Sequence, residues 1–286
     1  MLKVIKNYLS FIKFSHTVFA LPFAAIGFTS GIVIGKGDFT ILLAVKVLLC
    51  MIFARSAAMA FNRWADRNID AKNPRTKERE IPAGKISSNA ALAFIIFNCV
   101  GFIITTKFIN DLCFYLSFVA LAVVLGYSYM KRISPLCHLV LGLGLALAPL
   151  GAWLAVTGEF NLLPVLFSIA VLTWVGGFDI IYALQDIEFD KANNLKSIPS
   201  YFGLKNALSI SRVLHVITAG ILIFAGILGG FNILFFIGWL IFSGLLIYQH
   251  LLVKSDDLSR VNFAFFNTNG IASITLAIFV ITSLLL

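Results

Sequence analysis

The stretch from Asn62 to Lys85, NRWADRNIDAKNPRTKEREIPAGK, contains the first residues whose types and spacing could support chemistry. Asn62, Asp66 and Asp70 are four residues apart, so they share one face if the preceding helix continues through them. Stacked oxygen ligands suit Mg²⁺, which binds through one or two carboxylates together with substrate phosphates. The alternative is an ordinary loop in which the acids pair with nearby basic side chains, namely Arg63, Arg67 or Lys72.

A second acidic group follows in the sequence DIIYALQDIEFD. Its members are Asp179, Tyr182, Asp186 and Asp190, and the last two are again four residues apart. The aspartates at 66 and 70 recur at 186 and 190, an offset of 120 residues in both cases, although no wider repeat is visible. Equal offsets indicate equivalent positions in two halves of a helical bundle. Two such groups facing each other would hold a diphosphate through two Mg²⁺ ions.

Basic residues near both acidic groups fit the same chemistry. Arg75 and Arg79 are four apart in NPRTKERE, and a guanidinium fork matches the oxygens of a phosphate. Lys196 follows the second acidic group and is a similar candidate. The alternative role for these side chains is contact with lipid headgroups or the setting of membrane topology.

Between the two groups, GYSYMKRIS places Tyr127 and Lys131 one helical turn apart, with Arg132 next to them. One of the three could bind phosphate and another could hold an anionic acceptor. Lys131 and Arg132 also fit a purely topological role, because basic residues accumulate on the cytoplasmic side of membrane proteins.

The composition defines the elements that must position these residues. The chain is 60% hydrophobic and 12% charged, with a mean hydropathy of +0.97. Long apolar runs between short polar gaps exclude a soluble domain and predict an all-α integral membrane protein. Its 286 residues accommodate about eight to ten helices of roughly 20 residues. We expect a single domain over residues 1–286, a helical bundle around a central cavity.

Nine apolar segments are predicted as spans, after an interfacial helix over about residues 1–16 that is not a cleaved signal. They cover residues 16–35, 40–61, 89–107, 112–130, 135–156, 161–181, 205–228, 231–252 and 262–285. Basic residues gather in alternate connecting loops, which places the N-terminus and both acidic groups in the cytoplasm and the C-terminus outside. The net charge of +9 is therefore topological and calls for no nucleic acid. The four dispersed cysteines are expected to pack in the core.

These motifs resemble a known family. NRWADRNIDAKNPRTKEREIPAG is similar to the first signature of the UbiA superfamily of intramembrane aromatic prenyltransferases, and DIIYALQDIEFDKANNLKSIPSYFG is similar to the second. GYSYMKR and the opening KFSHTVFALPFA extend the resemblance, which is greatest to the 4-hydroxybenzoate polyprenyltransferase branch. Two positions depart from the pattern: Arg63 stands where many members have Asp, and Asn194 where many have Gly.

The resemblance implies a role for each candidate residue. One Mg²⁺ would be held by Asn62, Asp66 and Asp70, and a second by Asp186 and Asp190. The diphosphate would be contacted by Arg75, Arg79, Lys131 and Lys196, with Tyr127 in support. Asp179 would lie near the acceptor, and Arg132 could pair with the acceptor's carboxylate.

The implied reaction transfers a polyprenyl group from its diphosphate to a ring carbon of a 4-hydroxybenzoate-like acid in ubiquinone biosynthesis. The expected location is a bacterial-type inner membrane, with the active site on the cytoplasmic side and lipid around the helices. A hydroxynaphthoate acceptor in menaquinone biosynthesis is the alternative, and haem, chlorophyll and glycerol-phosphate acceptors fit the signatures less well. A cation- or proton-coupled transporter could use intramembrane acids such as Asp179. It would leave the two four-residue acid spacings unexplained.

Overall fold

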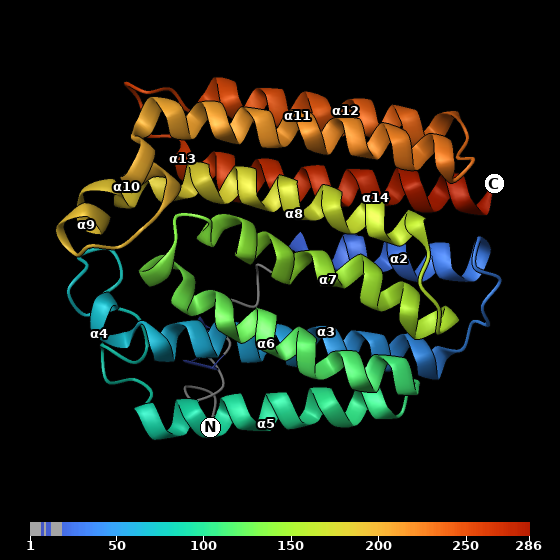
Figure 1. The fold of residues 1–286 in the computed structure, drawn as a ribbon, viewed down its shortest axis with the longest axis horizontal. Coiled ribbons are helices and arrows are strands. Elements are labelled where there is room, and N and C mark those ends of the chain that lie inside the picture. Colours follow the sequence, from blue (N-terminus) through green and yellow to red (C-terminus); the bar gives the residue numbers. More distant parts are fainter. Residues whose placement is uncertain (1–6, 9, 13–18) are drawn as a thin grey trace. The chain divides into compact units, whose positions relative to one another are not determined.

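The computed structural model describes residues 7–8, 10–12 and 19–286, and every regular element among them is helical (Figure 1). The protein is an all-α integral membrane protein, as predicted. Among the described residues, eight helices are long and apolar enough to cross a bilayer. The expected interfacial helix over residues 1–16 lies mostly outside the described residues.

The long helices follow the predicted segments closely. They are α3 (Ile41–Ala65), α5 (Ser88–Lys107), α6 (Asp111–Ile133), α7 (Cys137–Thr157), α8 (Leu162–Ala183), α11 (Leu204–Leu228), α12 (Ile233–Leu252) and α14 (Asn269–Leu285). The last span is completed by α13 (Val261–Phe263) and a π-helical turn, η3 (Ala264–Thr268). The first predicted span contains α2 (Leu21–Val33), whose 13 residues are shorter than a bilayer crossing. The prediction of nine spans therefore stays a prediction.

Polar side chains at the predicted loop ends determine where several helices begin. Thr40, Ser87, Asn161 and Asn232 each accept a hydrogen bond from a backbone N–H in the first turn of the following helix. These caps satisfy donors that have no partner within the helix.

The contacts divide the chain into two compact units. The first comprises Met1–Thr17 and Thr40–Tyr129. In it α3 packs along α5, and the short helix α4 (Arg67–Asp70) follows α3. Phe11, Ala60 and Ile95 belong to its buried core. Ile81, from the loop that carries the first acidic group, and Ile86, just after it, pack in the same cluster.

The second unit comprises Val18–Phe39 and Met130–Leu286. Its central helix is α8, which packs against α7 and α11, while α2 contacts α7 and α14. Trp174 on α8 is fully buried. A Cβ at Gly27 would overlap the backbone of Pro149, so glycine there allows α2 and α7 to approach closely. The single domain expected over residues 1–286 stays a prediction.

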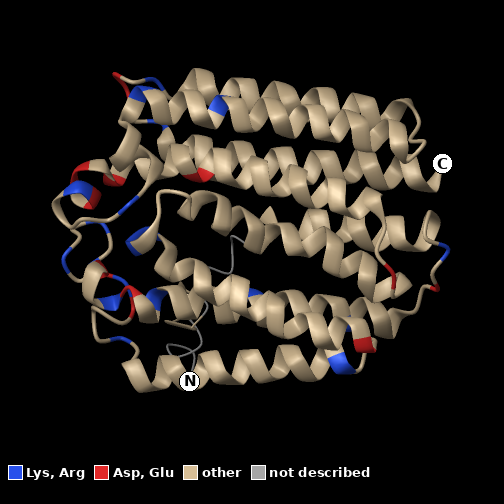
Figure 2. Cartoon of the chain, in the orientation of Figure 1, with Lys and Arg blue, Asp and Glu red and all other residues tan. Residues whose placement is uncertain are grey.

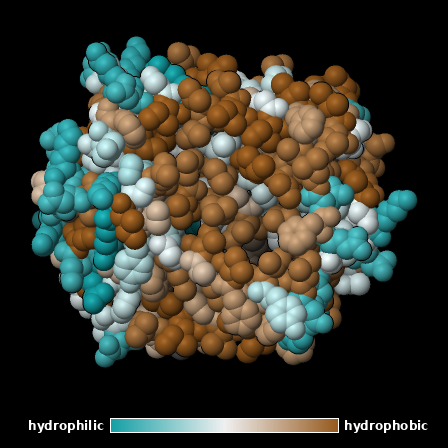
Figure 3. Space-filling model, in the orientation of Figure 1, coloured by the Kyte–Doolittle hydropathy of each residue, from teal (hydrophilic) through white to brown (hydrophobic). Residues whose placement is uncertain are grey.

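Charged side chains lie mainly at the ends of the helices in each unit (Figure 2). On the face shown in Figure 3, the surface between those ends is largely hydrophobic. This distribution is expected when lipid surrounds the helices and water reaches the loops.

Candidate functional site

The first acidic group lies where α3 ends. The helix stops at Ala65, and Asp66 has φ −92° and ψ 5°, outside the helical region. The chain then re-enters a helical turn, and the N–H of Asp70 donates to the carbonyl oxygen of Asp66 at 2.8 Å. The expected continuous helix is therefore broken at Asp66. This backbone region is sparsely populated and is often occupied by active-site residues.

The side chains of this group differ in environment. Asn62 Nδ2 donates to Asp66 Oδ2 at 3.1 Å, and both residues are half-buried. Asp70 is buried and forms an ion pair with Arg79. Nη1 of Arg79 lies 2.9 Å from each carboxylate oxygen of Asp70. The structure therefore neutralises Asp70 with one of the residues predicted to bind phosphate.

A buried ion pair ties the loop back to α3. Arg63 Nη1 donates to Glu80 Oε2, and both side chains are less than one-tenth exposed. Ser10 Oγ donates to the other carboxylate oxygen of Glu80 at 2.6 Å, and Phe11 lies beneath the Arg63 guanidinium at 5.9 Å. Arg63, one of the two departures from the family pattern, is thus a structural residue whose partner is Glu80.

The other two candidate residues of the first unit, Arg75 and Tyr127, differ in their exposure. Arg75 is exposed in the loop, where its N–H donates to Asn73 Oδ1. Tyr127 is half-buried near the end of α6.

The second acidic group repeats the local geometry of the first. Helix α8 ends at Ala183, a 3-10 turn, η2 (Leu184–Asp186), follows, and α9 (Ile187–Ala192) begins next. Asp186 has φ −106° and ψ 6°, close to the values of Asp66, and each acid precedes a short helix. The 120-residue offset is therefore matched by a shared backbone conformation.

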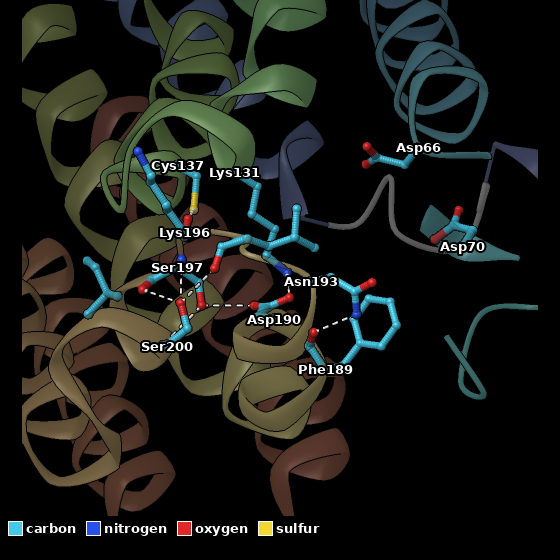
Figure 4. A network of polar contacts seen from close by, with 12 residues as sticks. Asp66, Asp70, Lys131, Cys137, Phe189, Asp190, Asn193, Lys196, Ser197 and Ser200 are labelled. Atoms are coloured by element: carbon cyan, nitrogen blue, oxygen red, sulfur yellow. Dashed lines mark hydrogen bonds and ion pairs between the residues drawn. The ribbon is translucent and has the colours of Figure 1, made fainter. Parts of the chain in front are cut away.

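Asp190 is fully buried and bonded through both carboxylate oxygens (Figure 4). Lys131 Nζ lies 2.9 Å from Oδ1, and Ser197 Oγ donates to Oδ2 at 2.9 Å. Asp186 is also buried. Like Asp70, Asp190 is held by a basic residue that the sequence assigns to phosphate binding.

The segment after α9 is anchored to the end of α6. The N–H of Lys196 donates to the carbonyl oxygen of Lys131 at 2.6 Å, and its Nζ donates to that of Ile133 at 3.1 Å. Arg132 is exposed. Asn194 has φ +54°, in the left-handed region that favours glycine and that asparagine tolerates best among other residues. The second departure from the family pattern therefore keeps a side chain compatible with this turn.

Helix α10 (Ile198–Phe202) begins at a reciprocal cap. Ser197 Oγ accepts from the N–H of Ser200, and Ser200 Oγ accepts from the N–H of Ser197. The hydroxyl of Ser197 thus connects the start of α10 to Asp190.

Asp179 lies near the end of α8 and is partly exposed. Its Oδ2 is 2.6 Å from Nδ1 of His138, a buried residue in the first turn of α7. The acid predicted to lie near the acceptor therefore has a histidine partner from a neighbouring helix.

The donor atoms fit a hard divalent cation. Each group offers carboxylate oxygens, and the first adds the amide oxygen of Asn62. Among the described residues, no cluster of three His, Cys, Asp or Glu side chains forms a metal site made of protein alone. Mg²⁺ usually takes only one or two carboxylates and completes its coordination with phosphate and water. The four cysteines are free.

The fold and the two matched groups define a polytopic helical membrane protein whose loops carry paired acidic and basic residues. A family model described as the UbiA prenyltransferase family matches residues 20–271. The chain belongs to this family.

Relatives with different acceptors in their names resemble the chain. A 4-hydroxybenzoate octaprenyltransferase of Vibrio parahaemolyticus is 32% identical over 72% of this chain and 69% of that protein. A protoheme IX farnesyltransferase of Ehrlichia ruminantium is 30% identical over 68% of this chain and 65% of that protein.

Solved structures share the fold. The apo structure of a UbiA homolog from Aeropyrum pernix has 31% identity and a TM-score of 0.84, and the match covers 93% of this chain and 97% of that one. A UbiA homolog from Archaeoglobus fulgidus bound to GPP and Mg²⁺ has 21% identity and a TM-score of 0.73, with coverage of 98% and 100%.

Ser197, Glu80 and His138 are among the members of these networks that were not predicted from the sequence. Ser197 carried a signal, because serine is a preferred N-cap residue and Pro199 follows it in the first turn of α10. Glu80 and His138 carried no such signal, because their partners, Arg63 and Asp179, are 17 and 41 residues away.

Proposed function

We propose that this protein transfers a polyprenyl group from a polyprenyl diphosphate to a ring carbon of a hydroxylated aromatic acid of the 4-hydroxybenzoate type. The observation that carries this proposal is the pair of acidic groups with matching local geometry. In each, an aspartate at a helix break precedes a buried aspartate held by a basic side chain. Such an arrangement suits metal-assisted binding of a diphosphate.

Two Mg²⁺ ions are proposed for these groups. Asn62, Asp66 and Asp70 would hold one ion, while Asp186 and Asp190 would hold the other. The ions would neutralise the negative charge that develops on the leaving diphosphate. The Mg²⁺ and GPP named for the Archaeoglobus homolog support binding of a divalent metal together with a prenyl diphosphate.

Substrate binding then requires an exchange of partners. Arg79 lies against Asp70, and Lys131 lies against Asp190. If metal takes each carboxylate, each cation is released to the diphosphate, which brings its own negative charge. Arg75, Lys196 and Tyr127 would add contacts to the same diphosphate. The ion pairs thus keep the acids neutralised until metal and substrate arrive together.

At the acceptor, Asp179 would polarise or deprotonate the phenol, and Arg132 would bind the acceptor's carboxylate. Departure of the diphosphate leaves an allylic cation, and the ring carbon ortho to the phenol attacks it. The ring proton would then pass to the released diphosphate, which restores aromaticity. A membrane-embedded site keeps this cation from water. We assign the site to the cytoplasmic face of a bacterial inner membrane.

The test is a product assay on membranes containing the protein, supplied with Mg²⁺, a polyprenyl diphosphate and an aromatic acid. The expected product is a C-prenylated acid. Asp66→Ala and Asp186→Ala should each lower turnover by more than about 100-fold, since a catalytic metal contributes several kcal/mol. Asp111→Ala removes an exposed acid at the far end of α6 and should leave turnover unchanged. Retained turnover in the two site variants would overturn the two-metal assignment.

A competition assay identifies the preferred aromatic acceptor. Offering 4-hydroxybenzoate and dihydroxynaphthoates together should give mainly prenylated 4-hydroxybenzoate. A prenylated naphthoate as the main product would assign the protein to menaquinone biosynthesis instead. Haem offered as a third acceptor tests the relationship to the Ehrlichia protein. A protein that forms no product with any acceptor but moves cations across the membrane would be a transporter.

A further inference from the structure

His138 and Asp179 form a hydrogen-bonded pair that the proposed reaction has not used so far. His138 is only 1% exposed and lies in the first turn of α7, while Asp179 lies near the end of α8. Nδ1 of the histidine is 2.6 Å from Oδ2 of the aspartate. Both residues belong to the second unit, as does the helix α10 that they approach.

The other nitrogen of the ring defines the tautomer. The backbone N–H of Ile198 donates to Nε2 of His138 across 3.3 Å. A nitrogen that accepts a hydrogen bond carries no proton, and the proton of a neutral imidazole is then on the other nitrogen. Nδ1–H therefore donates to Asp179, and His138 acts as a neutral donor.

This arrangement leaves one carboxylate oxygen of Asp179 available. Its side chain is 21% exposed, and within the described residues only Oδ2 is hydrogen-bonded. Asp70 and Asp190, by contrast, have both carboxylate oxygens engaged. His138 fixes one oxygen of Asp179 and leaves the second to meet a ligand.

A fixed orientation matters because a carboxylate otherwise rotates about its last bond with little preference. A partner that holds one oxygen determines where the other oxygen and its lone pairs point. Outer hydrogen bonds of this kind commonly change the function of the group they orient by about 10- to 100-fold.

The other nitrogen of the same imidazole contacts the segment that follows Asp190 in the chain. Ile198 is the first residue of α10 and directly follows Ser197, which bonds to Asp190. His138 therefore connects the carboxylate proposed for the acceptor to the loop proposed for the diphosphate. Its two hydrogen bonds come from different elements, so the ring is held at both nitrogens.

We propose that His138 is a positioning residue that holds Asp179 so that its free oxygen receives the hydroxyl of a phenolic acceptor. This inference rests on the proposed function, and it names the group that orients the acceptor. His138 itself touches neither substrate. Its loss should change use of the acceptor more than use of the prenyl diphosphate.

Two matched substitutions separate orientation from packing. His138→Leu fills similar space and removes the donor, and it should lower kcat/KM for the aromatic acid by about 10- to 100-fold. The KM for the prenyl diphosphate should stay unchanged. His138→Asn keeps an amide donor near the position of Nδ1 and should recover most of the lost activity. Equal losses in both variants, or a loss confined to the diphosphate, would overturn the proposal.

A third variant tests whether the two residues act as one. In an Asp179→Asn background, adding His138→Leu should cause little further loss of turnover, because the carboxylate to be oriented is already gone. Independent, multiplicative losses would contradict the proposal. Unfolding temperatures of all variants in detergent identify any that fail to fold, and His138→Asn serves as the folded comparison.

A binding measurement keeps this inference separate from the proposed reaction. With ¹⁵N-labelled histidine in the full-length protein, the His138 signals should report a proton on Nδ1. They should shift on addition of 4-hydroxybenzoate and remain in place on addition of inorganic diphosphate. This result would support the inference even if no prenylated product formed. A proton on Nε2, or no response to the phenol, would refute it.

Discussion

Replacing Arg79 with methionine tests the role of the ion pair in the first acidic group. Arg79 Nη1 is 2.9 Å from both oxygens of Asp70, whose side chain is 7% exposed, whereas that of Arg79 is 30% exposed. Arg79→Met removes the cation, keeps the apolar stem and leaves a buried carboxylate. A charge-assisted hydrogen bond contributes about 1.5 to 3 kcal/mol. Exposed pairs contribute about 0 to 1 kcal/mol and breaking buried pairs costs about 3 to 5.

One partner of this pair is buried and the other is partly exposed, so Arg79→Met should lower the free energy of unfolding by an intermediate amount, about 2 kcal/mol. For a chain of this size, 1 kcal/mol corresponds to about 2 to 4 °C in Tm, so the variant should unfold about 4 to 8 °C below wild type without metal. Mg²⁺ should reverse the loss, because it supplies the charge that Arg79 provided. At 100 times its Kd, a bound ligand stabilises the folded state by about 2.7 kcal/mol, enough to restore the wild-type Tm.

The assay is thermal unfolding in detergent with increasing Mg²⁺ and no substrate. Wild type should respond less to Mg²⁺ than the variant, since the metal must first displace Arg79. Lys77→Met removes one exposed positive charge from the same loop and should respond like wild type. Adding Asp70→Asn to the variant should remove the additional Mg²⁺ response that Arg79→Met shows over wild type. Equal Mg²⁺ shifts in wild type and Arg79→Met would refute the competition between cation and metal.

Three further predictions concern single contacts. Glu80→Gln and Arg63→Met should each lower stability by about 3 to 5 kcal/mol, and the double variant by less than their sum, in a double-mutant cycle followed by urea unfolding. Ser197→Ala should cost about 1 to 2 kcal/mol in the same measurement, because a helix cap and a bond to a buried carboxylate are lost together. Asn194→Ala should be less stable than Asn194→Gly by about 1 kcal/mol, and equal Tm values would contradict the importance of its positive φ.

The spans could be predicted because a membrane helix is recognised from the apolar composition of its own residues. All eight long helices lie at predicted segments, and their starts coincide with polar residues such as Ser87 and Asn161. The number of spans was harder to predict, since α2 has only 13 helical residues. Hydropathy indicates which residues are apolar but does not indicate where a helix begins.

The residue types of the site were visible in the sequence, but their partners were not. Spacing placed Asp66 and Asp70 on one helical face, whereas the backbone breaks at Asp66. The buried Asp70 that follows the break pairs with Arg79, nine residues on, a contact that helical periodicity does not indicate. His138 required knowledge of how α7 packs on α8. Sequence patterns report periodicity along one helix, and tertiary pairings lie beyond that range.

The pair formed by Arg63 and Glu80 has a consequence for how such a chain can evolve. Either residue alone would be a buried charge without its counterion, so a lineage that changes one position passes through a poorly folding intermediate. Among relatives, the residues at positions 63 and 80 should therefore change together. Relatives with an acidic residue at the position of Arg63 should lack one at the position of Glu80, because two buried carboxylates there would have no counterion.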